Sequence, residues 1–355
     1  MFFRLIAFGL LLFWLDVAQA GYAVVQKLNV IEMQKPQPLR LLSNSEPVSY
    51  LKIWHGDWKK YELELLRKSD NSLIQKNTYN TNPDGFRLVP DLSTQTKDRH
   101  LLIAGCSYTY GVGVNDHEVF SNLLARELPS WHVVNLGRGG GSVNEPLYLF
   151  GQYDVRGLGV PEEGVLIYNW IYIHAPRLMA TWDVVGWQSI FTPLYEVTGE
   201  ALTYKGTMGE QWSWRFFQRV KEQGLDYWWL RMMGLYTRWE MRAALKRSVL
   251  HLVELRKQYL KQFPRGQFVV TNFFGGPLTQ DHRDHDGFVA QLESHGITVW
   301  QTPQPVNPRK DILIPIDNHP NPLGHRIHAD NILAAGKGLF VSATSDRRLE
   351  KGRLK

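Results

Sequence analysis

Cysteine is almost absent from this sequence, because Cys106 is the only one among 355 residues. A single thiol can form no internal disulfide, which excludes a scaffold built on disulfides. After residue 20 the chain also lacks any apolar run of the roughly 20 residues that a membrane-spanning helix needs. Internal repeats and low-complexity blocks are missing too, which excludes repeat arrays and disordered chains. The remaining composition is that of a globular protein.

Positive charge is concentrated at one end of the chain. The formal net charge is +6, and residues 346–355 contribute five basic side chains against Asp346 and Glu350, which is half of that excess. A short basic tail over residues 339–355 explains this better than a basic face on the folded body. We therefore expect no nucleic-acid partner.

Residues 1–20 have the pattern of a secretory signal peptide. Arg4 precedes an apolar run from Leu5 to Leu15, and the segment ends in Ala18-Gln19-Ala20. The run is too short to span a bilayer, and the small residues fit cleavage after Ala20. We expect a periplasmic or secreted protein. The alternative is an uncleaved segment that anchors the protein in a membrane.

From residue 101 onward, short apolar runs alternate with helical stretches. The runs are Leu101–Ala104, Val133–Leu136, Val165–Tyr168, Phe268–Val270 and Ile297–Trp300. Their length and their β-branched and aromatic residues predict strands buried on both faces of a parallel sheet. Residues 239–263 have the clearest helical periodicity. Residues 21–94 mix short alternating pieces with turn signals, which predicts a small β-rich N-terminal region.

Tryptophan is concentrated in residues 178–239, between the third and fourth predicted strands. This segment holds seven of the 13 tryptophans. We expect a helical insertion that covers the sheet edge as a cap. Two interpretations stay open: Trp182 and Trp187 contact a substrate such as a sugar ring, or the tryptophans only pack the cap onto the body.

A candidate nucleophile follows the first predicted strand, in Gly105-Cys106-Ser107. The carboxyl end of a buried parallel strand is where open α/β sheets bind their ligands. A serine hydroxyl needs a base to take its proton and a third group to orient that base. Cys106 paired with a histidine is the alternative nucleophile, although a small buried thiol is the simpler explanation of this residue.

The missing partners stand near the C-terminus, in Asp317-Asn318-His319-Pro320-Asn321. His319 would act as general base toward Ser107 and later as acid toward the leaving alcohol, while Asp317 fixes the imidazole. The glycine-rich turn after the second strand, from Arg138 to Ser142, offers unobstructed backbone N–H groups. Gly140 and the N–H of Ser107 are therefore the expected oxyanion donors.

These blocks resemble those of the SGNH (GDSL) hydrolase superfamily in exported bacterial members. Gly105-Cys106-Ser107 resembles the Gly-Asp-Ser block, Asn135 to Gly140 the glycine block, and 317–321 the terminal Asp/His block. Asn82-Pro83-Asp84-Gly85-Phe86-Arg87 is similar to a lead-in found in exported members. The resemblance covers about residues 80–335. It implies a flavodoxin-like three-layer α/β/α fold with a five-stranded parallel sheet, and an esterase that needs no metal or organic cofactor.

The third block departs from the family pattern. The family has Gly-x-Asn-Asp after the third strand, with the asparagine donating to the oxyanion, whereas this chain reads Asn169-Trp170-Ile171-Tyr172-Ile173-His174. His174 falls near the expected position and its imidazole can donate. Asn169 is the alternative donor.

Two further features complete the assignment. Residues 281–286 are rich in Asp and His, but Arg283 interrupts them, so we expect a solvated loop and no metal site. Arg138 is a candidate for attracting an anionic substrate.

We therefore expect a hydrolase domain over residues 95–338, acting on O-acyl esters, most simply acetyl, of a carbohydrate or cell-surface polymer. Hydrolysis and transfer to a second hydroxyl are both compatible with this chemistry. The alternative is a weakly active or inactive polysaccharide-binding protein that retains the hydrolase fold.

Overall fold

The structure is a computed structural model. It describes residues 50–56, 60–67, 73–82, 85–90, 93–179, 191–211, 234–273, 282–303, 311–314 and 318–340. The expected signal peptide, Asp317, Trp182, Trp187 and the basic tail from residue 341 onward lie outside these residues. None of the helices in the described ranges is long and apolar enough to cross a membrane.

Five parallel strands form the centre of the molecule. They are β4 (Arg99–Gly105), β5 (Trp131–Gly137), β6 (Glu163–Trp170), β9 (Gln267–Asn272) and β10 (Thr298–Trp300). Their spatial order is β10-β9-β6-β4-β5, with all neighbouring pairs parallel. This is the flavodoxin-like order, with β4 at the point where the chain reverses its direction across the sheet. The five apolar runs therefore predict the five strands correctly.

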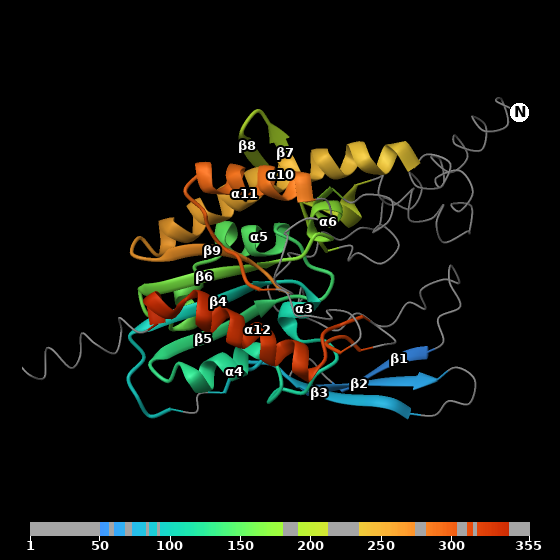
Figure 1. Ribbon diagram of the computed structural model, residues 1–355, viewed down its shortest axis with the longest axis vertical. Helices are drawn as coiled ribbons and strands as arrows, with labels where there is room; N and C mark the ends of the chain where they lie inside the picture. Colours follow the sequence, from blue (N-terminus) through green and yellow to red (C-terminus); the bar gives the residue numbers. More distant parts are fainter. Residues whose placement is uncertain are drawn as a thin grey trace, which may run out of the picture.

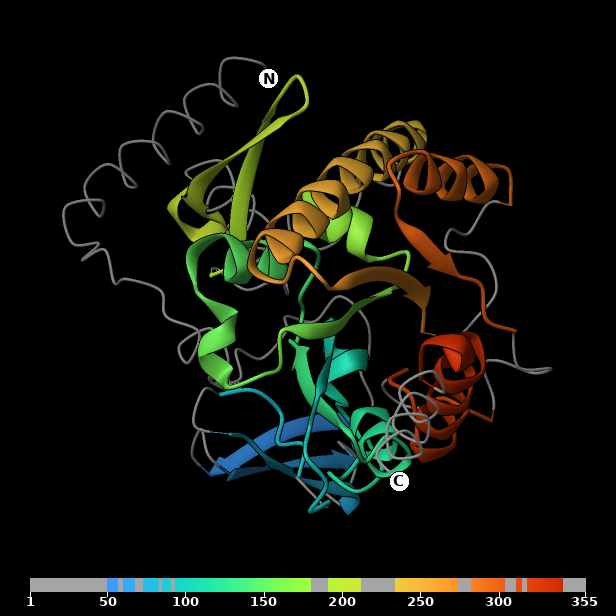
Figure 2. The ribbon, with the colours of Figure 1, turned by 90° about the vertical axis from the view of Figure 1, so that its left-hand side faces the viewer.

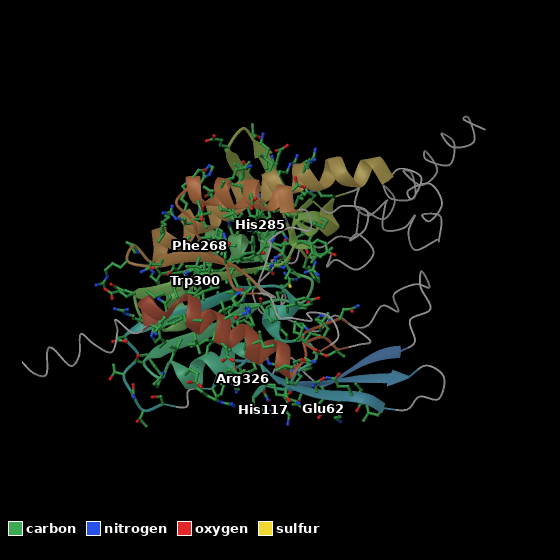
Figure 3. The ribbon with its side chains drawn as sticks, viewed as in Figure 1. Glu62, His117, Phe268, His285, Trp300 and Arg326 are labelled. Carbon is green, nitrogen blue, oxygen red and sulfur yellow. The ribbon has the colours of Figure 1, made fainter. Side chains whose placement is uncertain are left out.

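Helices cover both faces of this sheet (Figures 1 and 2). On one side lie α5 (Asn144–Gln152), α10 (Gly234–Gln262) and α11 (His282–Ser294); on the other lie α4 (Phe120–Glu127) and α12 (Pro322–Ala335). In Figure 3, His285 and Arg326 mark the two outer layers, with Phe268 and Trp300 in the sheet between them. The predicted three-layer α/β/α fold is confirmed.

The sheet has a hydrophobic core on each face, because its strands alternate. Leu102 and Ala104 of β4 pack toward α5 and α10. Leu101 and Ile103, their neighbours, pack toward α4 and α12. Side chains that alternate along a strand point to opposite faces, so a residue's place in this alternation decides which helical layer it meets.

Short helical turns complete the body. They are α3 (Ser107–Tyr110), η2 (Val155–Leu158) and α6 (His174–Met179). The first follows β4 and the last follows β6, so both lie at the carboxyl ends of central strands.

The insertion between β6 and β9 differs from the expected all-helical cap in its described part. Residues 193–207 form an antiparallel hairpin, β7 (Pro193–Thr198) and β8 (Ala201–Thr207), which is followed by η3 (Met208–Glu210). Gly199 begins the two-residue turn with a φ of +64°, a conformation that favours glycine. Tyr204 of this hairpin lies 4.9 Å from Tyr148 of α5, ring centre to ring centre, which packs the hairpin on the body.

The expected β-rich N-terminal region contains an antiparallel sheet in the order β1-β2-β3. Its strands are β1 (Tyr50–Gly56), β2 (Lys60–Arg67) and β3 (Leu73–Asn80). Strand β3 contacts the loop that follows α3. The Tyr79 hydroxyl accepts a hydrogen bond from the Gly113 N–H at 2.8 Å, and the Thr78 N–H donates to Asn115 Oδ1 at 3.0 Å.

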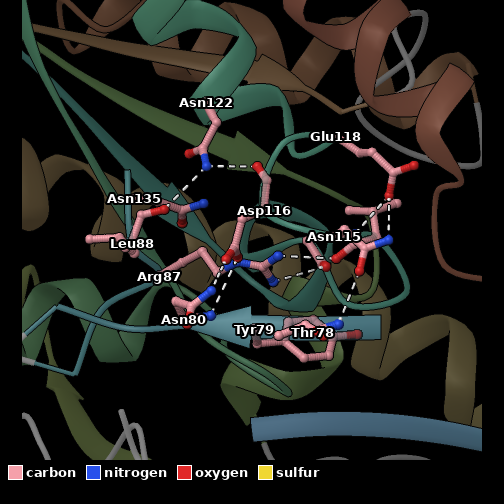
Figure 4. A network of polar contacts seen from close by, with 12 residues as sticks. Thr78, Tyr79, Asn80, Arg87, Leu88, Asn115, Asp116, Glu118, Asn122 and Asn135 are labelled. Atoms are coloured by element: carbon pink, nitrogen blue, oxygen red, sulfur yellow. Dashed lines mark hydrogen bonds and ion pairs between the residues drawn. The ribbon is translucent and has the colours of Figure 1, made fainter. Parts of the chain in front are cut away.

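Arg87 fixes this contact from a fully buried position (Figure 4). Its Nε lies 2.6 Å from Asp116 Oδ1, and its two terminal nitrogens donate to the carbonyl oxygens of Gly111 and Val114 at 3.3 and 3.0 Å. The guanidinium also lies over the Tyr79 ring, 4.4 Å from its centre. We call this set of contacts the Arg87 clamp. It ties the N-terminal sheet to the loop after α3.

Removing the carboxylate of the Arg87 clamp should cost much of the protein's stability. A buried guanidinium that loses its counter-charge keeps its desolvation cost, so we expect Asp116→Asn to lower the free energy of unfolding by about 3 kcal/mol. Asp154→Asn is the matched control, because Asp154 pairs with Arg156 on the surface. Urea denaturation should show a large loss for the first variant and no measurable change for the second. Equal effects of the two variants would contradict the clamp.

Candidate active site

Ser107 begins α3 directly after the centre of the sheet. Gly105 ends β4, Cys106 precedes the helix, and the Ser107 carbonyl accepts the N–H groups of Gly111 and Val112, each at 3.0 Å. A Cβ on Gly105 would lie 2.2 Å from Thr109 Oγ1, so only glycine lets the helix turn back this tightly. The tight turn presents Ser107 at the carboxyl edge of the sheet.

The glycine-rich turn lies next to this junction. The Arg138 N–H donates to the Gly105 carbonyl at 3.1 Å, and Gly141 closes the turn with a bond to the Arg138 carbonyl at 3.0 Å. Gly140 has a φ of +71° and open space where a Cβ would be. The Asn135 side chain stabilises the start of the turn: it accepts a hydrogen bond from the Gly137 N–H at 2.9 Å and donates one to the Thr109 carbonyl at 2.8 Å.

His319 lies in a tight loop that ends at α12. The Ile314 N–H donates to the His319 carbonyl at 2.8 Å, and the Asn318 N–H donates to the Ile314 carbonyl at 2.9 Å. Asn321 then caps α12 by accepting the Gly324 N–H at 3.0 Å. Pro322 at the start of that helix and the cap at Asn321 fix where the loop stops.

Residues adjacent to Ser107 contact this loop directly. The Tyr108 hydroxyl donates to the Asn318 carbonyl at 2.8 Å, and the Tyr108 ring lies 5.4 Å from the His319 imidazole, centre to centre. The space beside Gly113 is also occupied by this loop, because a Cβ there would lie 2.3 Å from Ile314 Cδ1 and 3.7 Å from His319 Cβ. The fold thus brings the candidate nucleophile and the candidate base to the same edge of the sheet. Nothing in the sequence spacing pointed to Tyr108 as the connecting residue.

The two candidate side-chain donors, Asn169 of β6 and His174 of α6, point to opposite faces of the sheet. Tyr168 and Trp170 pack toward α10, and His174 joins them: its Nδ1 lies 2.8 Å from the Tyr168 hydroxyl, and its ring lies 5.6 Å from Trp170. Asn169 alternates to the other face, where its Oδ1 lies 2.9 Å from His328 Nε2 of α12. Asn169 therefore shares its face with the helix that follows His319, and His174 does not.

Both candidate donors keep an unused polar atom. Among the described residues, no hydrogen-bond partner is found for Asn169 Nδ2 or His174 Nε2, although both atoms are buried. Burial, and secondarily the charge of Arg177, holds the pKa of His174 well below its ordinary value, so its imidazole is neutral. In this state each group can offer one N–H to a ligand.

Arg138 is almost completely buried beside the turn. Its Nη1 lies 4.0 Å from Glu145 Oε1, while Glu145 Oε2 accepts the Ser142 N–H at 2.6 Å. Burial lowers the pKa of Arg138, and Glu145 opposes that shift. In this position its guanidinium already faces a carboxylate of the protein itself.

Two histidines of α12, His325 and His328, are fully buried. His328 stacks on Phe273 at 4.0 Å, and His325 lies parallel to Phe120 at 5.9 Å. Burial lowers the pKa of His328 to about 3. The spacing of three residues places both histidines on one helix face, but the sequence does not show that this face is buried away from solvent.

No family model matches this chain, and no curated protein matches it. The solved structures similar to it include G-D-S-L lipolytic proteins and carbohydrate esterases. A member of the lipolytic protein G-D-S-L family from Veillonella parvula is 12% identical, with 66% of this chain and 97% of that chain covered and a TM-score of 0.36.

Two of the similar structures are named as carbohydrate esterases. An acetyl xylan esterase from the rumen bacterium Butyrivibrio proteoclasticus is 10% identical over 75% of this chain and 67% of its own, with a TM-score of 0.37. A family two carbohydrate esterase from Cellvibrio japonicus is 15% identical over 79% and 72%, with a TM-score of 0.38.

Acid should destabilise the protein through its buried histidines. Folded His328 and His100 have pKa values of about 3 and about 4, below the ordinary value of about 6.5, because both rings are desolvated. Each contribution is complete above about pH 6.5 and is lost as the pH falls toward the folded pKa, by about 1.4 kcal/mol per pH unit for each histidine. Urea denaturation between pH 7 and 5 should give a shallower pH slope for His328→Gln than for the unaltered protein. Parallel slopes would contradict the burial of a neutral His328.

Proposed function

We propose that this protein is an exported serine esterase of the SGNH hydrolase type. The observation that carries the proposal is the contact of Tyr108 with Asn318 and His319, because it places the residue after Ser107 against the imidazole of the candidate base. The two halves of this contact lie far apart in the sequence, on α3 and on the loop before α12. The resemblance of the three sequence blocks and the position at one edge of the sheet both support Ser107 and His319 as the reacting pair.

The chemistry assigned to the pair is acyl transfer. The Ser107 oxygen attacks the ester carbonyl while His319 takes the serine proton, which forms a tetrahedral intermediate. His319 then gives that proton to the leaving alcohol as the carbon–oxygen bond breaks, and an acyl-serine remains. A water molecule or a second alcohol repeats these steps and releases the acyl group. Asp317, which lies outside the described residues, is proposed to orient the imidazole.

For the oxyanion we propose the N–H groups of Ser107 and Gly140 together with the side chain of Asn169. The turn that holds Gly140 is hydrogen bonded to Gly105, two residues before Ser107. Asn169 is preferred over His174 because its side chain lies on the α12 face of the sheet, where the His319 loop ends. In the tautomer with its proton on Nε2, His328 donates to Asn169 Oδ1 and leaves the Asn169 amide N–H groups for a ligand.

The proposed substrate is an O-acyl ester, with acetyl as the first choice, on a carbohydrate or cell-surface polymer. Export and the tryptophan-rich insertion support this choice, and Trp182 and Trp187 are the proposed sugar-contacting residues. Transfer of the acyl group to a second sugar hydroxyl follows the same steps as hydrolysis. We further propose that residues 95–338 form the hydrolase domain.

Replacing the nucleophile should abolish activity without affecting the fold. We expect the protein to react with a fluorophosphonate at Ser107, and Ser107→Ala to lower the turnover of an activated acetyl ester by at least about a thousandfold. Mass spectrometry of the labelled peptide locates the modified residue, and turnover is followed by release of the chromogenic alcohol.

The matched control is Ser248→Ala on α10. Ser248 is completely buried, and its hydroxyl donates to the Ala244 carbonyl at 2.7 Å within the same helix. This variant should label and turn over like the unaltered protein. Label on Cys106, or full turnover by Ser107→Ala, would overturn the assignment and favour a thiol nucleophile or a binding protein.

The proposed role of Asn169 as an oxyanion donor can be tested by a second substitution. Removing one oxyanion donor costs on the order of a hundredfold to a thousandfold in kcat, so we expect a loss of this size for Asn169→Ala with little change in KM. Asn77→Ala is the matched control, because Asn77 is another buried asparagine but lies on β3 of the N-terminal sheet. Full activity in Asn169→Ala would return the donor role to His174.

A further inference from the structure

Tyr108 occupies a position between three elements of the site. Its hydroxyl donates to the Asn318 carbonyl at 2.8 Å, and its ring meets the His319 imidazole edge to face at 5.4 Å and the Phe273 ring at 5.7 Å. Phe273 in turn stacks on His328 of α12. The Tyr108 ring is therefore packed against Phe273 as well as against the imidazole.

The hydrogen bond from Tyr108 falls at the most constrained point of the His319 loop. Asn318 has a φ of +56°, and it is the only residue other than glycine with a positive φ in the described part of the chain. Asparagine tolerates this left-handed conformation better than other side chains do, but not as freely as glycine. A partner for the Asn318 carbonyl stabilises the turn that aims the next residue, His319.

A second segment also contacts the His319 loop. Gly113, in the loop tied down by the Arg87 clamp, lies against Ile314 and His319. The backbone of the loop is closed by the Ile314 N–H bond to the His319 carbonyl. His319 thus contacts both the loop after α3 and the Tyr108 ring.

We propose that Tyr108 is a positioning residue that holds the His319 imidazole toward Ser107. The ring limits the rotation of the imidazole, and the hydroxyl fixes the Asn318 turn from which His319 projects. This inference rests on the proposed roles of Ser107 and His319. Tyr108 directly follows Ser107 in α3. One short helical turn therefore carries both the proposed nucleophile and the residue that positions the proposed base.

The test compares variants that remove the hydroxyl and the ring separately. Tyr108→Phe keeps the ring and loses one hydrogen bond, so the kcat for an activated acetyl ester should fall by about threefold to tenfold with KM unchanged. Tyr108→Leu loses the ring contact as well and should lower kcat further. The rate of fluorophosphonate labelling should fall in parallel, because that reaction needs the serine and the base but no substrate binding.

Tyr259→Phe is the matched control for stability. The Tyr259 hydroxyl also lies against a histidine, 2.8 Å from His100 Nε2, but in the core on the α10 side of the sheet. This variant should lower the melting temperature at least as much as Tyr108→Phe while leaving kcat and the labelling rate unchanged. A loss of activity that only follows melting temperature across these variants would overturn the positioning role.

Asn318 tests the same idea from the other partner. Asn318→Ala disfavours the left-handed turn and should lower kcat, whereas Asn318→Gly accepts it and should keep kcat. Because both changes act on one turn, Tyr108→Phe and Asn318→Ala together should cost less than the product of their separate effects.

The outcomes separate this inference from the proposed function. If the protein labels at Ser107 but Tyr108→Phe and Tyr108→Leu react at the unaltered rate, Tyr108 has no positioning role and the esterase assignment stands. If the unaltered protein neither labels nor turns over, the esterase assignment fails, and the positioning role fails with it.

Discussion

The close approach of three backbones at one edge of the sheet is the constraint on which the rest of the site depends. Gly105 has no room for a side chain beside Thr109, and Gly137 has none beside the backbone of Tyr110, where a Cβ would lie 2.4 Å from the nitrogen. These contacts let α3 settle onto the ends of β4 and β5. If a larger residue held these strands and the helix apart, Ser107 and the glycine-rich turn would not lie at the same edge of the sheet.

That edge is a meeting point of elements from the whole chain. The N-terminal sheet reaches it through the Arg87 clamp, the central strands through β4, β5 and β6, and the C-terminal segment through the loop before α12. Apolar cores hold the central strands and α12, whereas the N-terminal sheet and the His319 loop are also tied to the region of α3 by polar contacts such as Arg87–Asp116 and Tyr108–Asn318. Such contacts are strict about geometry, because a buried polar group that loses its partner is costly.

The architecture could be predicted from the sequence because it depends on local patterns. Apolar runs such as Val165–Tyr168 are bounded by turn residues, and a strand buried on both faces needs little else to be recognised. The helical insertion was the weak point. Its hairpin at 193–207 has the alternation of a strand and a glycine turn, which the high tryptophan content of the surrounding segment obscured.

The site was predictable only in part. Sequence blocks indicated Ser107 and His319, because a serine and a histidine are the residue types that the proposed chemistry needs at these places. The choice between Asn169 and His174 needed the tertiary structure, because Asn169 points from β6 toward α12 whereas His174 begins α6 and contacts Tyr168 on the other side of the sheet. The link that Tyr108 makes to the His319 loop and the burial of His328 both depend on contacts between segments far apart in the chain. No local pattern records such contacts.

The Arg87 clamp and the His319 loop also set an order on the assembly of the site. The clamp involves only residues before about position 140, so the loop beside Ser107 can be complete as soon as the first half of the chain has been synthesised. His319 arrives after β10, the last strand of the sheet, has been made. A nascent chain that already has all five strands still lacks His319, so the contact between Tyr108 and the His319 loop can form only near the end of synthesis.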